Sequence, residues 1–218
     1  MKTLILIASF FLTLSAYGRS FELSGLPAGW KASATIDRCG QRSCGGSGHI
    51  ILHKDGFRQR IDSKHLLSSG ASLPAEGGVL SAEDSQSLLV MKDFNFDGLP
   101  DVAVRNGNNS LNRSASYDIY TQRPSGHFTF DEDLSELALY GTGLFEVDNR
   151  RQVLITTAQT GCCFRTFEEW KIFPDEGWQE VGRSTWDGFR SEDYALVTEE
   201  KLVKGRWEDS SRYVRKRQ

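Results

Sequence analysis

Residues 93–101 read Asp-Phe-Asn-Phe-Asp-Gly-Leu-Pro-Asp. In this stretch oxygen-bearing side chains recur at alternate positions, and a glycine that permits a sharp turn stands at the sixth position. A chain uses this spacing to wrap a hard cation, usually Ca²⁺. Three carboxylates this close together repel one another unless a cation lies among them. The sequence therefore predicts a calcium site formed by the side chains of Asp93, Asn95, Asp97 and Asp101 and by the backbone carbonyl of Leu99.

The flanks of this acidic stretch distinguish it from an EF-hand. An EF-hand loop ends on a bidentate Glu, and the corresponding position here is Val104. Short apolar runs, Leu88–Met91 and Val102–Val104, lie on either side, and such runs beside a turn are typical of strands. We therefore expect a strand, a calcium loop and a second strand. The alternative is a solvated acidic turn without metal, in which Asp, Asn and Gly serve only the turn geometry.

The rest of the chain indicates an all-β fold built from hairpins, with one short helix. Turn signals recur between apolar runs, and each turn glycine is followed within two residues by an aromatic side chain. Such hairpins stack around a shared core, so we expect a small β-propeller-like domain, with a sandwich as the alternative. The turn signals are Lys54-Asp55-Gly56, Pro124-Ser125-Gly126, Asp175-Glu176-Gly177 and Lys204-Gly205.

Two further segments carry local signals. Acidic residues open the run 131–139, in which Leu134, Leu137 and Ala138 share one helical face, so this run predicts two turns of helix. Segment 68–87 is rich in Ser, Gly and Ala and is expected to form an exposed loop.

The first residues resemble a targeting segment. Lys2 precedes the apolar run Leu4–Leu14, which is too short to span a bilayer, and the small residues Ala16 and Gly18 follow it. These features predict a signal peptide over residues 1–18 and a single β domain over residues 19–218, with a membrane anchor as the alternative. We expect a periplasmic protein, with secretion from the cell as the other possibility. No other stretch is apolar enough to span a membrane, and the net charge of −3 argues against nucleic-acid binding.

The four cysteines agree with export, because disulfides persist in oxidising compartments. The residues are Cys39, Cys44, Cys162 and Cys163. Three connectivities are possible, and we favour the local one, in which Cys39 pairs with Cys44 and the adjacent Cys162 and Cys163 pair with each other. The two crossed pairings and a zinc site of four thiolates are the alternatives.

No catalytic signature is present in the sequence. The chain has no Gly-x-Ser-x-Gly elbow, no His-Glu-x-x-His pair and no phosphate-binding glycine loop. We therefore expect a binding protein and not an enzyme. The candidate binding segment is residues 105–116, a polar stretch between two strong strands. The calcium loop is expected to act as a clamp at the base of this segment; a surface loop without function is the alternative.

Several runs, taken in order, resemble a family of exported bacterial proteins with a calcium-bound, propeller-like β fold. Described members of that family include periplasmic immunity proteins, which inhibit lysozyme-like peptidoglycan hydrolases delivered by rival bacteria. The resemblance covers about residues 35–185. The runs are Asp93–Gly98, Arg105–Gly107, Ser116–Asp118, Phe145–Asp148 and Gly161–Cys163.

The resemblance implies Ca²⁺ at the acidic stretch and an inhibitory loop that enters the cleft of a hydrolase. Periplasmic lysozyme inhibitors often use a Ser-Gly-x-Tyr-like loop, and Ser114-Ala115-Ser116-Tyr117 is similar, with Ala115 in place of the glycine. Arg113 would add a cation that complements the carboxylates of such a cleft. Tyr117 has the alternative role of a core aromatic on a strand. The function classes kept open are an inhibitor or immunity protein, a calcium-dependent adhesin or carbohydrate-binding module, and a secreted hydrolase.

Overall fold

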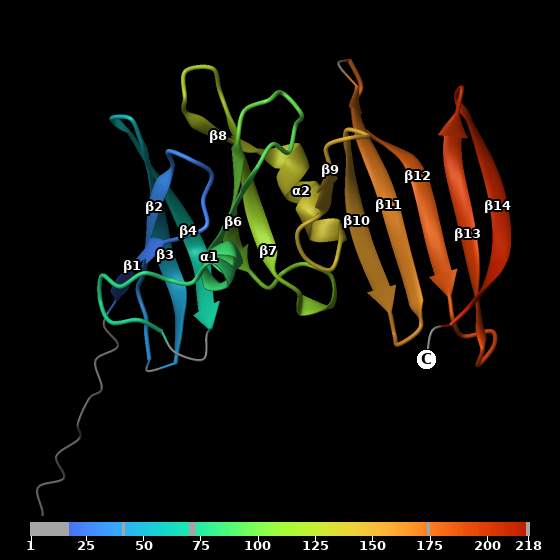
Figure 1. Ribbon diagram of the computed structural model, residues 1–218, viewed down its shortest axis with the longest axis horizontal. Coiled ribbons are helices and arrows are strands. Elements are labelled where there is room, and N and C mark those ends of the chain that lie inside the picture. Colours follow the sequence, from blue (N-terminus) through green and yellow to red (C-terminus); the bar gives the residue numbers. More distant parts are fainter. Residues whose placement is uncertain (1–17, 41, 70–72, 174, 217–218) are drawn as a thin grey trace, which may run out of the picture.

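The computed structural model describes residues 18–40, 42–69, 73–173 and 175–216. All of the predicted signal peptide except Gly18 lies outside the described residues. The described chain is mostly antiparallel β, with two short helices, as the sequence predicts for fold class. It forms three sheets that follow one another along the long axis of the molecule in chain order (Figure 1).

Each sheet is a meander in which strands adjacent in sequence are also hydrogen-bonded neighbours. The first sheet contains β1 (Arg19–Leu23), β2 (Lys31–Ile36), β3 (Ser43–Lys54) and β4 (Phe57–Ser69). The middle sheet contains β5 (Leu89–Lys92), β6 (Asp101–Gly107), β7 (Ser116–Gln122) and β8 (Phe128–Asp131). The third sheet contains β9 (Glu146–Asp148), β10 (Val153–Thr160), β11 (Phe164–Phe173), β12 (Gly177–Asp187), β13 (Tyr194–Val203) and β14 (Arg206–Arg215).

The four predicted hairpins are all present, as β3–β4, β7–β8, β11–β12 and β13–β14. The first and last close on two-residue turns, Asp55-Gly56 and Lys204-Gly205, and all four of these residues have positive φ. Two consecutive positive φ angles are typical of a type I′ turn, whose twist matches that of the flanking strands. The predicted propeller-like arrangement is not established, because the first and third sheets lie at opposite ends of the molecule and do not close a ring (Figure 1).

One helix is as predicted and the other was missed. α2 (Glu132–Tyr140) begins at Asp131, whose carboxylate accepts a hydrogen bond from the backbone N–H of Leu134 at 3.0 Å. α1 (Ala82–Leu88) occupies the end of the segment 68–87 expected to be a loop and extends one residue beyond it. Ser81 caps it by accepting a hydrogen bond from the backbone N–H of Asp84 at 3.0 Å. A serine three residues before an acid is a helix-start signal that the composition of the segment obscured.

The middle sheet separates two hydrophobic cores. Val102 and Val104 of β6 face the first core, which the first sheet covers, whereas Ala103 faces the second core. The second core lies between the middle sheet, α2 and the third sheet, and Figure 1 shows α2 between those two sheets. Residues 101–105 are therefore buried on both faces of the sheet. This explains why residues 102–104 of β6 form an apolar run and do not alternate between apolar and polar residues.

Both predicted local disulfides are present. Cys39 is bonded to Cys44 and Cys162 to Cys163, so no thiolate of these four remains for zinc. Among the described residues, no helix has the length and apolar character needed to cross a bilayer.

Leu154 of β10 is fully buried in the second core, where the third sheet meets α2. Leu154→Ala should lower the free energy of unfolding by roughly 2–5 kcal/mol, because it leaves a cavity in a packed interior. Leu139→Ala, on the exposed side of α2, is the matched control and should change it by about 0.5 kcal/mol or less. Urea denaturation measures both, and equal losses would contradict the placement of Leu154 in the core.

Candidate functional site

The acidic loop connects β5 to β6 and folds over its own oxygen atoms. Oδ1 of Asp93 and Oδ1 of Asn95 both accept a hydrogen bond from the backbone N–H of Asp97, each at 3.2 Å. The second oxygen of Asp93 accepts from Gly98 N–H at 2.9 Å. Phe96 and Gly98 have φ of 63° and 86°, left-handed conformations that tighten the turn. The side chains at loop positions one and three therefore converge on one point.

Asp97 belongs to the same cluster. Its Oδ1 accepts from the backbone N–H of Leu99 at 2.8 Å, and its Oδ2 accepts from Nδ2 of Asn95 at 3.0 Å. Asp97 is exposed, whereas Asp93 and Asn95 are half-buried. Two carboxylates and one amide oxygen thus gather at the surface of the loop, and this is the hard oxygen donor set that suits Ca²⁺.

Asp101 lies apart from this cluster, on the interior side of the loop. It is fully buried, and its Oδ2 accepts hydrogen bonds from the backbone N–H groups of Phe94 at 2.8 Å and Asn95 at 3.3 Å. Its Oδ1 accepts from the backbone N–H of Gln122, at the end of β7, at 2.9 Å. Burial raises the pKa of the Asp101 carboxyl to about 6, against the opposite effect of these hydrogen bonds.

Its three backbone hydrogen bonds distinguish Asp101 from the other members of the predicted ligand set. In the described part of the chain, no group of three or more His, Cys, Asp or Glu side chains is gathered as it would be around an ion. Three members of the predicted set, Asp93, Asn95 and Asp97, lie together at the surface of the loop, and their binding of calcium stays a prediction. Asp101 instead supports the loop from within, a role that sequence spacing did not reveal.

The aromatic residues between these polar positions anchor the loop. Phe94 is fully buried and packs edge-on against Phe145, with ring centroids 5.5 Å apart. The ring centroid of Phe96 lies 6.4 Å from that of Trp178 on β12. The alternation of polar and aromatic residues therefore places oxygen atoms outside and rings against the second core.

The polar segment 105–116 does not extend from the acidic loop. The acidic loop precedes β6 and residues 108–115 follow it, so the two lie at opposite ends of this seven-residue strand. Their separation is about 20 Å at the usual rise of a strand. The expectation that the acidic loop clamps the base of the polar segment is therefore wrong.

Residues 108–115 are instead held by the end of α2 and by the third sheet. The Ser110 hydroxyl and the Leu111 N–H both donate to the carbonyl of Gly141, the latter at 3.1 Å. Nδ2 of Asn112 donates to the carbonyl of Gln159, at the end of β10, at 2.8 Å. Leu111–Arg113 form one tight turn, in which Asn112 and Arg113 both have a left-handed φ of 58°. Contacts to two distant segments hold this loop in place.

Two of the four residues expected to contact a partner are buried. Ser116 is fully buried, and its Oγ accepts from the backbone N–H of Asn109 at 3.1 Å. Tyr117 packs in the second core, beneath the guanidinium of Arg105, which lies 5.8 Å from its ring. Their expected role at a partner surface is therefore corrected to a structural one, because both begin β7. Arg113 is exposed, and Ser114 is half-buried.

A polar hollow of about 720 Å³ opens beside this loop, between the first and middle sheets. Arg105 supports its wall through hydrogen bonds to the carbonyl of Gly107 at 2.7 Å and to the side chain of Asn108. Burial raises the pKa of Asp118, although a hydrogen bond from Asn106 opposes this effect. The hollow is lined by Asp62, Lys64, His65, Asn106, Gly107, Asn108, Asn109, Asp118 and Tyr120.

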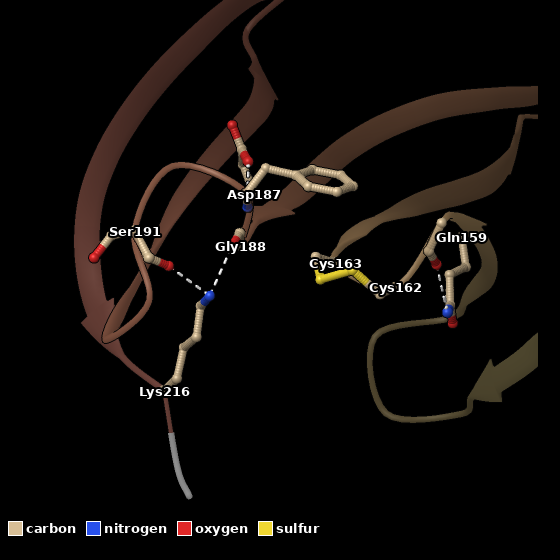
Figure 2. The surroundings of a disulfide bond; sticks show 9 residues. Gln159, Cys162, Cys163, Asp187, Gly188, Ser191 and Lys216 are labelled. Carbon is tan, nitrogen blue, oxygen red and sulfur yellow. Dashed lines mark hydrogen bonds between the residues drawn. A yellow bond between two sulfur atoms is a disulfide. The ribbon is translucent and has the colours of Figure 1, made fainter.

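A second hollow, of about 530 Å³, lies at the turn that contains the Cys162–Cys163 disulfide. Figure 2 shows Lys216 reaching from the end of β14 to the carbonyls of Gly188 and Ser191, each at 2.6 Å. The backbone N–H of Gly188 in turn donates to the carbonyl of Cys163 at 2.8 Å. These bonds tie the disulfide turn to the C-terminal strand. Among the described lining residues, Arg165, Arg215 and Lys216 are cations and none is an acid. The full lining is Cys162, Cys163, Arg165, Phe167, Trp186, Val214, Arg215 and Lys216.

Comparison with known proteins yields a neighbour in fold. The chain matches no family model and no curated protein. A solved structure described as a Xanthomonas type IV secretion system related protein is similar, with a TM-score of 0.63 and 20% sequence identity. The similarity covers 88% of this chain and 93% of that chain. At this identity it shows a shared fold.

Asp101→Ala should be strongly destabilising even without metal. The substitution leaves buried backbone N–H groups without an acceptor, so we expect a loss of roughly 3 kcal/mol in the free energy of unfolding. Asp97→Ala is the matched control and should cost less than about 1 kcal/mol, because water replaces an exposed carboxylate. The measurement is urea denaturation in the presence of EDTA. Equal effects of the two substitutions would contradict the distinction between a buried support and a surface donor.

Proposed function

We propose that this protein is an exported, calcium-stabilised binding protein that inhibits a lysozyme-like peptidoglycan hydrolase, as an immunity protein does. The observation that carries the proposal is loop 108–115, which is hydrogen-bonded to Gly141 and Gln159 and presents the exposed Arg113. Two disulfides support an oxidising compartment such as the periplasm. The shared fold with a protein related to a type IV secretion system is in keeping with export in bacteria.

Calcium would have a structural role in this proposal. The side chains of Asp93, Asn95 and Asp97 and the carbonyl of Leu99 would hold the ion, while Asp101 fixes the loop from the interior. Bound Ca²⁺ would offset the repulsion between Asp93 and Asp97. Because the loop is anchored on the second core through Phe94, calcium would stabilise the contact between the middle and third sheets.

The partner surface would combine Arg113 and Ser114 with the polar hollow beside them. Asn108 and Asn109 line that hollow and belong to the same loop, so one segment contributes to both. Among the described residues Arg113 takes part in no ion pair. A hydrolase cleft is lined by carboxylates, which a cation and neutral amides complement. A loop that is already ordered loses little conformational entropy on binding.

Calcium should raise the melting temperature of the wild-type protein. A ligand that binds only the folded state stabilises it by about 2.7 kcal/mol at a concentration 100 times its Kd, which corresponds to roughly 5–10 °C for a chain of this size. Asp97→Asn should lose most of this increase, whereas Asp193→Asn, which changes an exposed carboxylate in the loop between β12 and β13, should keep it. Calorimetric scans with Ca²⁺ and with EDTA provide the measurement. A melting temperature that is the same in both buffers would refute the calcium proposal.

Arg113→Ala should weaken inhibition at least tenfold while the fold stays intact. The expected cause is the loss of a charge-assisted contact to a carboxylate of the enzyme. The assay is the clearing of a peptidoglycan suspension by a lysozyme-like hydrolase recovered from envelope or rival-cell extracts on the immobilised protein. Circular dichroism checks the fold.

Arg58→Ala, an exposed arginine on β4, is the matched control and should inhibit as well as the wild type. Tyr117→Ala should instead lower the melting temperature, since Tyr117 is a core residue. An Arg113→Ala protein that inhibits as strongly as the wild type would overturn the proposed binding surface.

A further inference from the structure

β14 is an edge strand of the third sheet that no described strand or helix covers. It contains ten residues, and within the described part of the chain it pairs only with β13. All of its side chains are exposed except the half-buried Val214. Its pairing with β13 has no bulge, and it contains no proline. A long, regular edge presents a row of free backbone groups to another strand.

The other strands at sheet ends do not offer such an edge. β1, β5, β8 and β9 have five, four, four and three residues. β4 is long, but it lies against β6 and α1. Natural sheets commonly blunt their edges with short strands or covering elements, as these do. β14 therefore stands out as a surface available for strand pairing.

The hairpin turn determines which backbone groups of β14 point outward. Lys204-Gly205 is a two-residue turn, so the flanking residues Val203 and Arg206 exchange both hydrogen bonds. Hydrogen-bonded and non-hydrogen-bonded pairs alternate along an antiparallel ladder. The N–H and C=O groups of the odd-numbered residues, from Trp207 to Arg215, therefore point away from β13.

This alternation restricts how β14 can pair with a second β14. In an antiparallel pair of two β14 strands, odd-numbered residues must lie opposite odd-numbered ones to exchange hydrogen bonds, and even-numbered residues then lie opposite even-numbered ones. A two-fold axis relating the strands therefore passes between one residue, odd or even, and its own copy. An axis at Asp209 would oppose two aspartates, and one at Arg212 would oppose two arginines. An axis at Ser211 would bring no opposite charges face to face.

An axis at Ser210 gives complementary pairs of two kinds, one of opposite charges and one of aromatic rings. Glu208 then lies opposite Arg212 of the second copy, and this pair occurs twice by symmetry. Trp207 lies opposite Tyr213, also twice, and both rings are exposed in the single chain, at 49% and 65%. Opposite charges and aromatic pairs across strands stabilise a sheet. No like charges lie directly opposite one another within the strand in this register.

We infer that two copies of this protein pair through β14, antiparallel and centred on Ser210, so that their third sheets become one continuous sheet. Arg212 already contacts Glu199 of β13 at 2.7 Å, which holds its guanidinium on the face where the second copy's Glu208 would lie. The exposed Trp207 and Tyr213 become covered, and the outward backbone groups gain partners. The interface is independent of the acidic loop and of loop 108–115.

A charge-exchange experiment tests the register. The wild-type protein should show twice the mass of one chain by light scattering at rising concentration. Glu208→Arg and Arg212→Glu should each be monomeric. Each substitution gives residues 208 and 212 the same charge, and these residues lie opposite each other at two places in the dimer. An equimolar mixture of the two variants should form a heterodimer, since every opposed pair is then of opposite sign. A monomeric wild type, or a mixture that stays monomeric, would overturn the inference.

Cross-linking gives a second test that does not depend on charge. In the inferred register Ser210 faces its own copy in a non-hydrogen-bonded pair, so Ser210→Cys should form an intermolecular disulfide under mild oxidation. Ser211→Cys is the matched control and should not, because the two copies of residue 211 are offset along the strand and lie beyond disulfide reach. Equal cross-linking of both variants, or of neither, would contradict the register.

Discussion

The buried carboxylate of Asp101 holds together the part of the molecule on which the rest is arranged. It accepts hydrogen bonds from two N–H groups of the acidic loop and from one at the end of β7, while its own backbone begins β6. β6 in turn is covered by a hydrophobic core on each face. A charge is tolerated at this depth only because its acceptor atoms are satisfied. The carboxylate thus fixes the entry of the chain into the strand that separates the two cores.

In the proposed function, the calcium site and the partner-binding loop lie at opposite ends of one strand, β6. The acidic loop lies at the start of β6, where Phe94 and Phe96 anchor it on the second core and on β12. The loop with Arg113 lies beyond the other end of β6, held by Gly141 and by Gln159. Calcium at the first site would therefore act on a bound partner only through the packing of the middle sheet. The expected direct clamp had no basis in the fold, because a strand keeps its two ends apart.

Local chemistry made much of the fold predictable from the sequence. Asp55-Gly56 and Lys204-Gly205 identify their turns through residues that accept positive φ, and Asp131 identifies the start of α2 as a cap. The close spacing of the cysteines favoured local bonds. Features that depend on distant contacts were not predictable. Ser116 looks like a loop residue until β7 is known, and the choice between a loop and a core role for Tyr117 depends on the second core. α1 is fixed partly by Ser85, whose hydroxyl accepts from Ser24 N–H at 2.9 Å. The role of Asp101 likewise depends on Gln122, a residue of another strand.

The central claim is that the surface of the acidic loop holds calcium while Asp101 supports it from behind. Anomalous diffraction from crystals grown with Ca²⁺ tests it most directly. The account predicts one anomalous peak at the loop, about 2.3–2.6 Å from oxygen atoms of Asp93, Asn95, Asp97 and Leu99, with Asp101 still bonded to the N–H groups of Phe94 and Gln122. A loop without a peak in calcium-soaked crystals, or an ion bound by Asp101 after it has released those N–H groups, would contradict it.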